Sequence, residues 1–214
     1  MPTIPTKVPA KIECNKVLLV ERDDEVRLFE ELIKFMGWTP NVDIQMRKIN
    51  GKDNRDEFEV FLNDPGFPIV KGYAIIRDAD TNAGSALQSV RKLLSDQGQP
   101  CSMESSEFES NGELTVGIFI MPGHAKTGML EDLCLLSVKD HPVMPHVEGF
   151  MSRVQETMQD NAPKNESKAK TQAFLSAMHK PVPHLGVAAQ CGYWPFDKEA
   201  FSNIREFIER LMKS

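Results

Sequence analysis

Apolar stretches alternate with polar ones along the first two-thirds of the chain. Four stretches are continuously apolar or alternate apolar with polar residues, which predicts strands over about 16–20, 42–46, 72–77 and 114–121. Apolar residues recur at helical spacing after each of them, which predicts helices over about 24–36, 53–63, 84–96 and from 129 onward. A regular alternation of strand and helix is typical of a parallel sheet with helices on both faces. The sequence therefore predicts an α/β fold.

The pattern changes near residue 139, after which helical spacing continues without strands. Further helices are predicted over 147–158, 165–179 and 198–212. The polar, turn-rich segment 97–113 is interpreted as a hairpin arm. We expect an α/β core over residues 12–140 and a helical C-terminal extension over 141–214 that packs on this core, within a single domain.

Composition and charge narrow the class of protein. Hydrophobic residues make up 41% of the chain and charged residues 26%, which is ordinary for a soluble globular protein. The net charge of −6 argues against non-specific binding to nucleic acid or anionic membranes, although a bound metal reverses the field locally. No apolar run approaches the ~18 residues that a membrane span needs, and the four cysteines lack the spacing of a zinc or redox site. We therefore expect a cytoplasmic protein with reduced cysteines and no membrane association.

Acidic side chains follow two of the predicted strands. Glu21 comes directly after the apolar run 17–20, and Asp78 and Asp80 close the run that begins at Tyr73. Parallel strands end at a common edge of the sheet, where open α/β folds bind ligands. With an extended backbone Asp78 and Asp80 would point the same way, and such a pair of like charges is relieved by a cation. The three acids predict a Mg²⁺ or Mn²⁺ site for phosphoryl chemistry, and a capped turn after the strand is the alternative.

Further acids lie at the predicted starts of two helices. Asp23, Asp24 and Glu25 open the first helix, where acids complement the helix dipole and cap its N–H groups. Glu131 and Asp132 open the helix after the fourth strand. They either add metal ligands at the same edge of the sheet or stabilise the start of that helix, and the sequence leaves both interpretations open.

The loop before that helix and an aromatic segment near the C-terminus are further candidates. His124 and Lys126 lie in a glycine-bounded loop, where they could contact a phosphate group or stand in a solvated turn. The aromatic segment 193–196 is interpreted as a packing element rather than as a platform on which nucleic-acid bases stack.

Two families resemble parts of this pattern and differ at specific residues. The segment 18–27 resembles the opening of a response-regulator receiver, but Asp78 comes too late in the chain to be the phosphoacceptor. The Asp-x-Asp pair resembles the motif of haloacid-dehalogenase phosphatases, but Asn82 stands where that motif has threonine or valine. Neither resemblance therefore accounts for the chain.

A third resemblance covers most of the chain. A glutamate after the first strand and an Asp-x-Asp pair after the third are similar to the pattern of Toprim domains, which topoisomerases, primases and overcoming-lysogenization-defect (OLD) nucleases share. Together with the segments 128–132 and 186–197, the pattern resembles a small Toprim-like family catalogued as a domain of unknown function. The resemblance implies a Toprim-like (Rossmann-like) parallel sheet flanked by helices, with its core over about residues 16–138.

The same resemblance implies roles for individual acids. Glu21, Asp78 and Asp80 would be the catalytic and metal-binding residues. OLD-type enzymes place further acids at positions that fall on Glu25 and on the segment that contains Glu131. These five acids are therefore the predicted ligands of Mg²⁺ or Mn²⁺.

The chain departs from the Toprim pattern at Arg22, which stands where the family usually has glycine. The substitution removes backbone freedom and adds a cation beside the predicted site. Arg22, His124 and Lys126 are the basic residues that we expect to contact the substrate.

The expected function is Mg²⁺-dependent cleavage of phosphodiester bonds in DNA or RNA, because the acids that match the Toprim pattern serve that chemistry in Toprim nucleases. A catalytically silent Toprim-like module that binds a partner or a nucleotide is the first alternative, favoured by the acidic net charge and by Arg22. A phosphatase that acts on small phosphoesters is the second.

Overall fold

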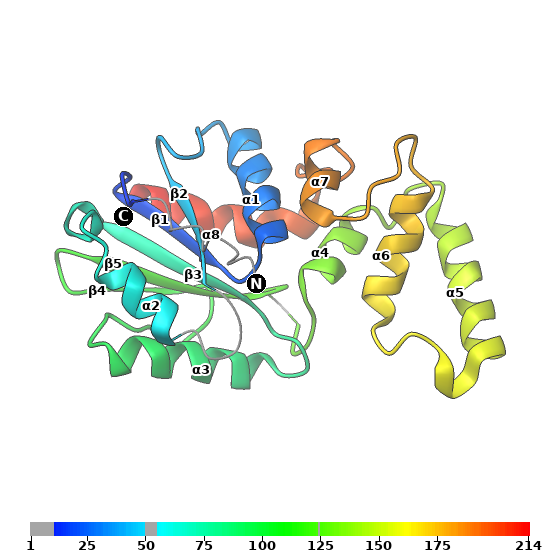
Figure 1. The fold of residues 1–214 in the computed structure, drawn as a ribbon, viewed down its shortest axis with the longest axis horizontal. Coiled ribbons are helices and arrows are strands. Elements are labelled where there is room, and N and C mark those ends of the chain that lie inside the picture. Colours follow the sequence, from blue (N-terminus) through cyan, green and yellow to red (C-terminus); the bar gives the residue numbers. More distant parts are fainter. Residues whose placement is uncertain (1–10, 50–54, 124) are drawn as a thin grey trace, which may run out of the picture.

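Four parallel strands and one short antiparallel strand form the sheet of the protein. The computed structural model describes residues 11–49, 55–123 and 125–214 (Figure 1). The strand order is β2-β1-β3-β5-β4, with β4 antiparallel to β5 and the other strands parallel. The bounds are Lys16–Val20 (β1), Gln45–Lys48 (β2), Gly72–Asp78 (β3), Phe108–Ser110 (β4) and Thr115–Met121 (β5). The predicted α/β fold is confirmed.

Helices connect the strands and continue beyond the sheet. The α-helices are α1 (Asp23–Phe35), α2 (Arg55–Leu62), α3 (Ala83–Asp96), α4 (Leu130–Ser137), α5 (Met144–Met158), α6 (Glu166–Ser176), α7 (Leu185–Gln190) and α8 (Ser202–Lys213). Short 3₁₀ turns lie at Phe67–Ile69, Gln159–Asn161 and Glu199–Phe201. Helices α5 and α6 lie side by side at the end of the molecule away from the sheet (Figure 1). Among the helices of the described residues, none combines the length and apolar composition that crossing a membrane requires.

Alternate residues of the parallel strands face two separate hydrophobic layers. Leu18 and Ala74 belong to the layer that contains the buried faces of α1 and α8, whereas Leu19 and Ile75 belong to the layer that contains those of α2 and α3. All five residues of β1 are buried, which explains why the four that follow Lys16 are apolar. Helices therefore cover both faces of the sheet (Figure 1), and both β1 and β3 end at the same edge of it.

The second strand begins three residues later than its sequence pattern predicts. Residues 41–44 form a turn in which Asn41 has a φ of 61°, a left-handed conformation that asparagine tolerates. The Asn41 N–H donates to the Ile44 carbonyl at 2.8 Å, and Asp43 Oδ2 accepts the Thr39 N–H at 2.7 Å. These local hydrogen bonds compete with strand formation, so the alternation over 42–46 was a misleading signal.

Helix α7 is a six-residue element that the sequence did not reveal. It packs on the start of α1, where Asp24 Oδ2 accepts the Leu185 N–H at 2.9 Å and Asp24 Oδ1 accepts the Gly186 N–H at 3.0 Å. A Cβ atom at Gly186 would lie 2.6 Å from the Asp24 carbonyl oxygen, so only glycine allows this approach. Six residues are too few for helical periodicity to be recognised.

Replacing Asp24 by alanine should lower the free energy of unfolding by about 1–3 kcal/mol, because two N–H groups at the start of α7 lose a charged acceptor. Asp23→Ala is the matched control, since Asp23 lies in the same turn but is 74% exposed and pairs with Lys48 at 2.8 Å. Its loss should stay below about 1 kcal/mol. Urea unfolding measures both variants, and equal losses would contradict the role of Asp24 in holding α7.

Candidate functional site

Three acids from two strand ends and one helix meet at the carboxyl edge of the sheet. Glu21 follows β1, Asp78 ends β3, and Glu25 lies in the first turn of α1. One carboxylate oxygen of each lies within 4.8 Å of the corresponding oxygens of the other two. Glu25 is 1% exposed and Asp78 is 3% exposed. Such close, buried like charges require protons or cations to neutralise them.

Asp78 lies at the centre of this group and is held from two sides. Its Oδ1 accepts the Leu130 N–H at 2.9 Å, at the start of α4, and its Oδ2 accepts a hydrogen bond from the Arg22 guanidinium. Burial first and the charge of Glu25 second, against the opposing charge of Arg22, raise the pKa of Asp78 to about 8. The ion-free site therefore favours a protonated Asp78 at neutral pH.

Two arginines neutralise part of the acidic charge. Arg22 pairs through Nε with Glu25 Oε1 at 2.7 Å and through Nη2 with Asp78, and Arg77 Nε pairs with Glu21 Oε1 at 3.1 Å. Burial raises the pKa of both Glu21 and Glu25, in spite of these arginines. Burial opposes the charge of Arg22, but Asp78 and Glu25 outweigh that effect and raise the arginine pKa.

Glu131 adds a fourth buried carboxylate beside the group. It lies in the first turn of α4, is 7% exposed, and its Oε2 has no hydrogen-bond partner among the described residues. Its negative charge raises the pKa of Asp78 and of Arg22, so it lies within electrostatic range of both. Four carboxyl groups and two guanidinium groups, those of Arg22 and Arg77, therefore lie together at this edge of the sheet.

Asp80 lies apart from the three acids that meet at the sheet edge. The prediction that Asp78 and Asp80 point the same way required an extended backbone, but Asp80 has a φ of 50° and is exposed. Its carbonyl accepts the Gly128 N–H at 2.9 Å, which ties the loop after β3 to the loop after β5. Asp80 still contributes to the field, because its charge raises the pKa of Glu21.

Asp80 also borders a cavity of about 510 Å³ that the acids do not fill. The cavity lies between the loop after β5, the start of α4 and the start of α6; its lining includes Thr127, Gly128, Met129, Lys164 and Asn165. Of the predicted metal ligands, Asp80 is the one that lines this cavity among the described residues.

The remaining predicted residues have other partners or stand apart. Asp132 caps α4 by accepting the Met129 N–H at 2.8 Å, so the helix-stabilising interpretation applies to it. Glu25 belongs to the group of three acids and also accepts the Glu21 N–H, just before α1, at 2.8 Å. Lys126 is exposed, and its carbonyl accepts the Ala83 N–H at 2.8 Å. His124 lies outside the described residues.

Arg77 is the site residue that sequence reasoning missed. It precedes Asp78 on β3, and its ion pair with Glu21 joins the ends of two adjacent strands. The available signal was a charged residue at the end of an otherwise apolar strand, because such a residue requires a partner when it is not fully exposed.

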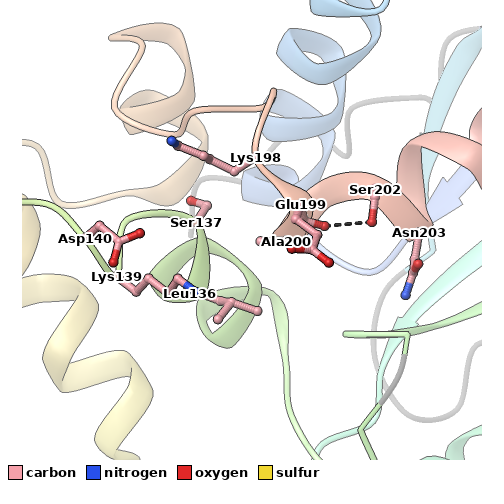
Figure 2. A pocket seen from close by; sticks show the side chains of 9 residues that line it. All are labelled: Leu136, Ser137, Lys139, Asp140, Lys198, Glu199, Ala200, Ser202 and Asn203. Atoms are coloured by element: carbon pink, nitrogen blue, oxygen red, sulfur yellow. Dashed lines mark hydrogen bonds between the residues drawn. The ribbon is translucent and has the colours of Figure 1, made fainter.

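A second cavity, of about 490 Å³, lies between α4 and the start of α8 (Figure 2). Its lining side chains come from the end of α4 with the turn that follows, and from the segment around Glu199 and Ser202 (Figure 2). None of the predicted metal ligands lines this second cavity, whereas Asp80 lines the first. The first cavity is therefore the candidate for the functional site.

Structures of similar fold come from OLD proteins. The C-terminal region of the Burkholderia pseudomallei OLD protein matches with a TM-score of 0.53 and 13% identity, over 94% of this chain and 98% of that chain. The C-terminal region of the Xanthomonas campestris pv. campestris OLD protein matches with a TM-score of 0.50 and 13% identity, over 94% and 95% of the two chains. At this identity the likeness shows the fold alone.

Comparisons at the sequence level give a family without an assigned activity. No curated protein gives a significant match. Residues 15–213 match the family model described as a protein of unknown function, DUF3226. The match extends from the residue before β1 to the last residue of α8, and so includes every acid of the site. The chain therefore belongs to the DUF3226 family.

Proposed function

We propose that the protein is a Mg²⁺-dependent phosphodiesterase of Toprim type that cleaves DNA or RNA, with Mn²⁺ able to replace Mg²⁺. The observation that carries the proposal is the convergence of Glu21, Glu25 and Asp78 within 4.8 Å at the carboxyl edge of the sheet. The likeness in fold to the C-terminal regions of OLD proteins supports it, as does the resemblance of the acidic pattern to Toprim domains.

The donor set fits a hard divalent cation. Carboxylate oxygens are the ligands that Mg²⁺ and Mn²⁺ prefer, and the buried, unpartnered Oε2 of Glu131 offers a further one. Glu21, Glu25 and Asp78 would hold the ion, with Glu131 as a further ligand and Asp80 at the rim of the site. The bound ion would activate a water molecule and neutralise charge on the scissile phosphate.

The chain positions these acids before any ion binds. The Leu130 N–H fixes Asp78, and Arg77 fixes Glu21. Because Glu25 and Asp78 are buried, packing sets the orientation of their carboxylates. The cavity at Asp80 would give a phosphodiester access to the rim of the site. The exposed Lys126 belongs to the loop after β5, and other residues of that loop line the cavity.

A cleavage assay tests the proposal. We expect Mg²⁺- or Mn²⁺-dependent cleavage of at least one of single-stranded DNA, duplex DNA and RNA, and no activity on phosphomonoesters. The double variant Glu21→Gln/Asp78→Asn should be inactive, whereas Asp56→Asn, which changes an exposed acid of α2, should behave like the wild type. Equal cleavage by the double variant, or no cleavage of any substrate by the wild type, would refute it.

A silent binding module is the second candidate, and one observation favours it. Arg22 already bridges Glu25 and Asp78, so those two acids have a cation without any metal. Such a module would bind neither Mg²⁺ nor Mn²⁺ in a way that depends on Asp78, and this separates it from the phosphodiesterase.

A further inference from the structure

Arg22 lies between solvent and the two most buried acids of the site. Its side chain is 40% exposed, whereas those of Glu25 and Asp78 are 2% exposed. Its two contacts come from different nitrogens of one planar group, Nε to Glu25 and Nη2 to Asp78. A cation that approaches these two carboxylates from solvent therefore meets the guanidinium first.

The other contacts of the two acids come from the backbone. Glu25 Oε2 accepts the Glu21 N–H at 2.8 Å, and Asp78 Oδ1 accepts the Leu130 N–H at 2.9 Å. These donors are fixed by β1 and by α4, so they cannot move without disturbing the fold. Arg22, by contrast, has a long and partly exposed side chain that can take another rotamer. Among the described residues, an incoming ion can therefore displace Arg22 from the two acids more easily than it can displace the backbone N–H donors.

The backbone at Arg22 does not require the glycine that is usual in the Toprim pattern. Its φ of −134° and ψ of 155° are extended values that any residue adopts, and its side chain makes no capping hydrogen bond to α1. The conformation of the chain after Glu21 is therefore independent of the side chain at position 22. What the arginine contributes is its charge and its two hydrogen bonds.

We propose that Arg22 is a built-in cation that pairs with Glu25 and Asp78 in the metal-free protein and competes with the divalent ion for them. The inference rests on the proposed metal site, and the displacement of Arg22 from the two acids by the ion is called the gate. When the ion binds, Arg22 leaves Asp78 and turns toward solvent. Arg22 then offsets part of the acidic charge in the metal-free state, and the ion does so in the bound state, so metal affinity is lower than four clustered carboxylates alone would give.

Calorimetric titration of the full chain with Mn²⁺ tests the gate, without reference to activity. Arg22→Gln removes the charge and should tighten Mn²⁺ binding at least about tenfold, because an adjacent positive charge no longer opposes the ion. Arg22→Lys keeps the charge on a single nitrogen that cannot bridge both acids, and its affinity should fall between those of the wild type and Arg22→Gln. Lys48→Gln is the matched control, because Lys48 pairs with Asp23 at the end of the neighbouring strand and should change affinity less than about threefold.

Thermal unfolding supplies a second readout. Metal-free Arg22→Gln should melt below the wild type, since its buried acids lose their counterion, and saturating Mn²⁺ should remove most of the difference. Circular dichroism shows whether each variant is folded before titration, and Arg22→Lys carries the test if Arg22→Gln does not fold.

The outcomes separate the gate from the metal site. Unchanged or weaker Mn²⁺ binding by the Arg22 variants would overturn the gate. The metal site would still stand if the wild type binds Mn²⁺ and the single variant Asp78→Asn does not. If no variant and no wild-type sample binds Mn²⁺, both the metal site and the gate are wrong.

Discussion

The metal-free protein should become more stable at pH 8 when Asp78 is replaced by asparagine. The pKa of Asp78 is about 8 in the folded protein against an ordinary value of 3.8, because burial and then the charge of Glu25 disfavour its ionised form. Between these values the folded state holds a proton that the unfolded state has released. The free energy of unfolding of the wild type therefore falls as pH rises, by about 1.4 kcal/mol per pH unit from this group.

Asparagine removes that dependence and preserves the main contact. Its side-chain oxygen can still accept the Leu130 N–H, and Arg22 retains Glu25. The stability difference between Asp78→Asn and the wild type should therefore be small near pH 4 and grow to a few kcal/mol near pH 8. Urea unfolding in the presence of a chelator measures it at several pH values.

Asp56→Asn is the control for this pH series, and its difference from the wild type should not change with pH. Saturating Mg²⁺ should reverse the order at pH 8, because only the wild type gains stability from the ion. A difference between Asp78→Asn and the wild type that is independent of pH would contradict the assignment of Asp78 as a destabilised acid.

Cleavage should depend far more on Glu25 and Asp78 than on Asp80. Glu25 and Asp78 belong to the group whose oxygens lie within 4.8 Å, whereas Asp80 is exposed and turned away by its φ of 50°. Glu25→Gln and Asp78→Asn should each lower kcat/KM about a thousandfold, equal to about 4 kcal/mol of transition-state stabilisation. Asp80→Asn, at the rim of the cavity, should cost about tenfold.

Single-turnover cleavage assays at saturating Mn²⁺ separate a loss of chemistry from a loss of metal binding. Asp132→Asn is a useful comparison, because Asp132 lies in the same turn of α4 as Glu131 but caps the helix. It should affect stability more than cleavage. A larger loss of cleavage for Asp80→Asn than for Glu25→Gln would show that the ion lies toward the cavity and not among the buried acids.

The parts of the site that follow from strand order were predictable from the sequence. Apolar runs identified β1 and β3, and the parallel arrangement then placed Glu21 and Asp78 at one edge. The resemblance to Toprim domains added Glu25 and Glu131, which the structure places beside Asp78. These features depend on periodicity and on which residue follows a strand, and both are local properties.

The parts that depend on backbone turns and on long side chains were not predictable. The position of Asp80 is determined by its own left-handed backbone conformation, which no periodic pattern in the sequence indicates. The partners of Arg22 and Arg77 depend on rotamers and on a three-dimensional arrangement of acids that sequence spacing does not contain. Helix α7 depends on its contact with Asp24, 161 residues away along the chain, and so on tertiary packing.

Titration with Mn²⁺ in the wild type and in Asp78→Asn tests the central claim most directly, since electron paramagnetic resonance counts the free ion without any substrate. We predict that the wild type takes up Mn²⁺ in a saturable way with a Kd below about 1 mM, a free energy of about −4 kcal/mol or better. Asp78→Asn and Glu25→Gln should each abolish this uptake, and Asp56→Asn should leave it unchanged. Uptake that is the same in all four proteins, or absent from the wild type, would contradict the assignment of a divalent-cation site to the carboxyl edge of the sheet.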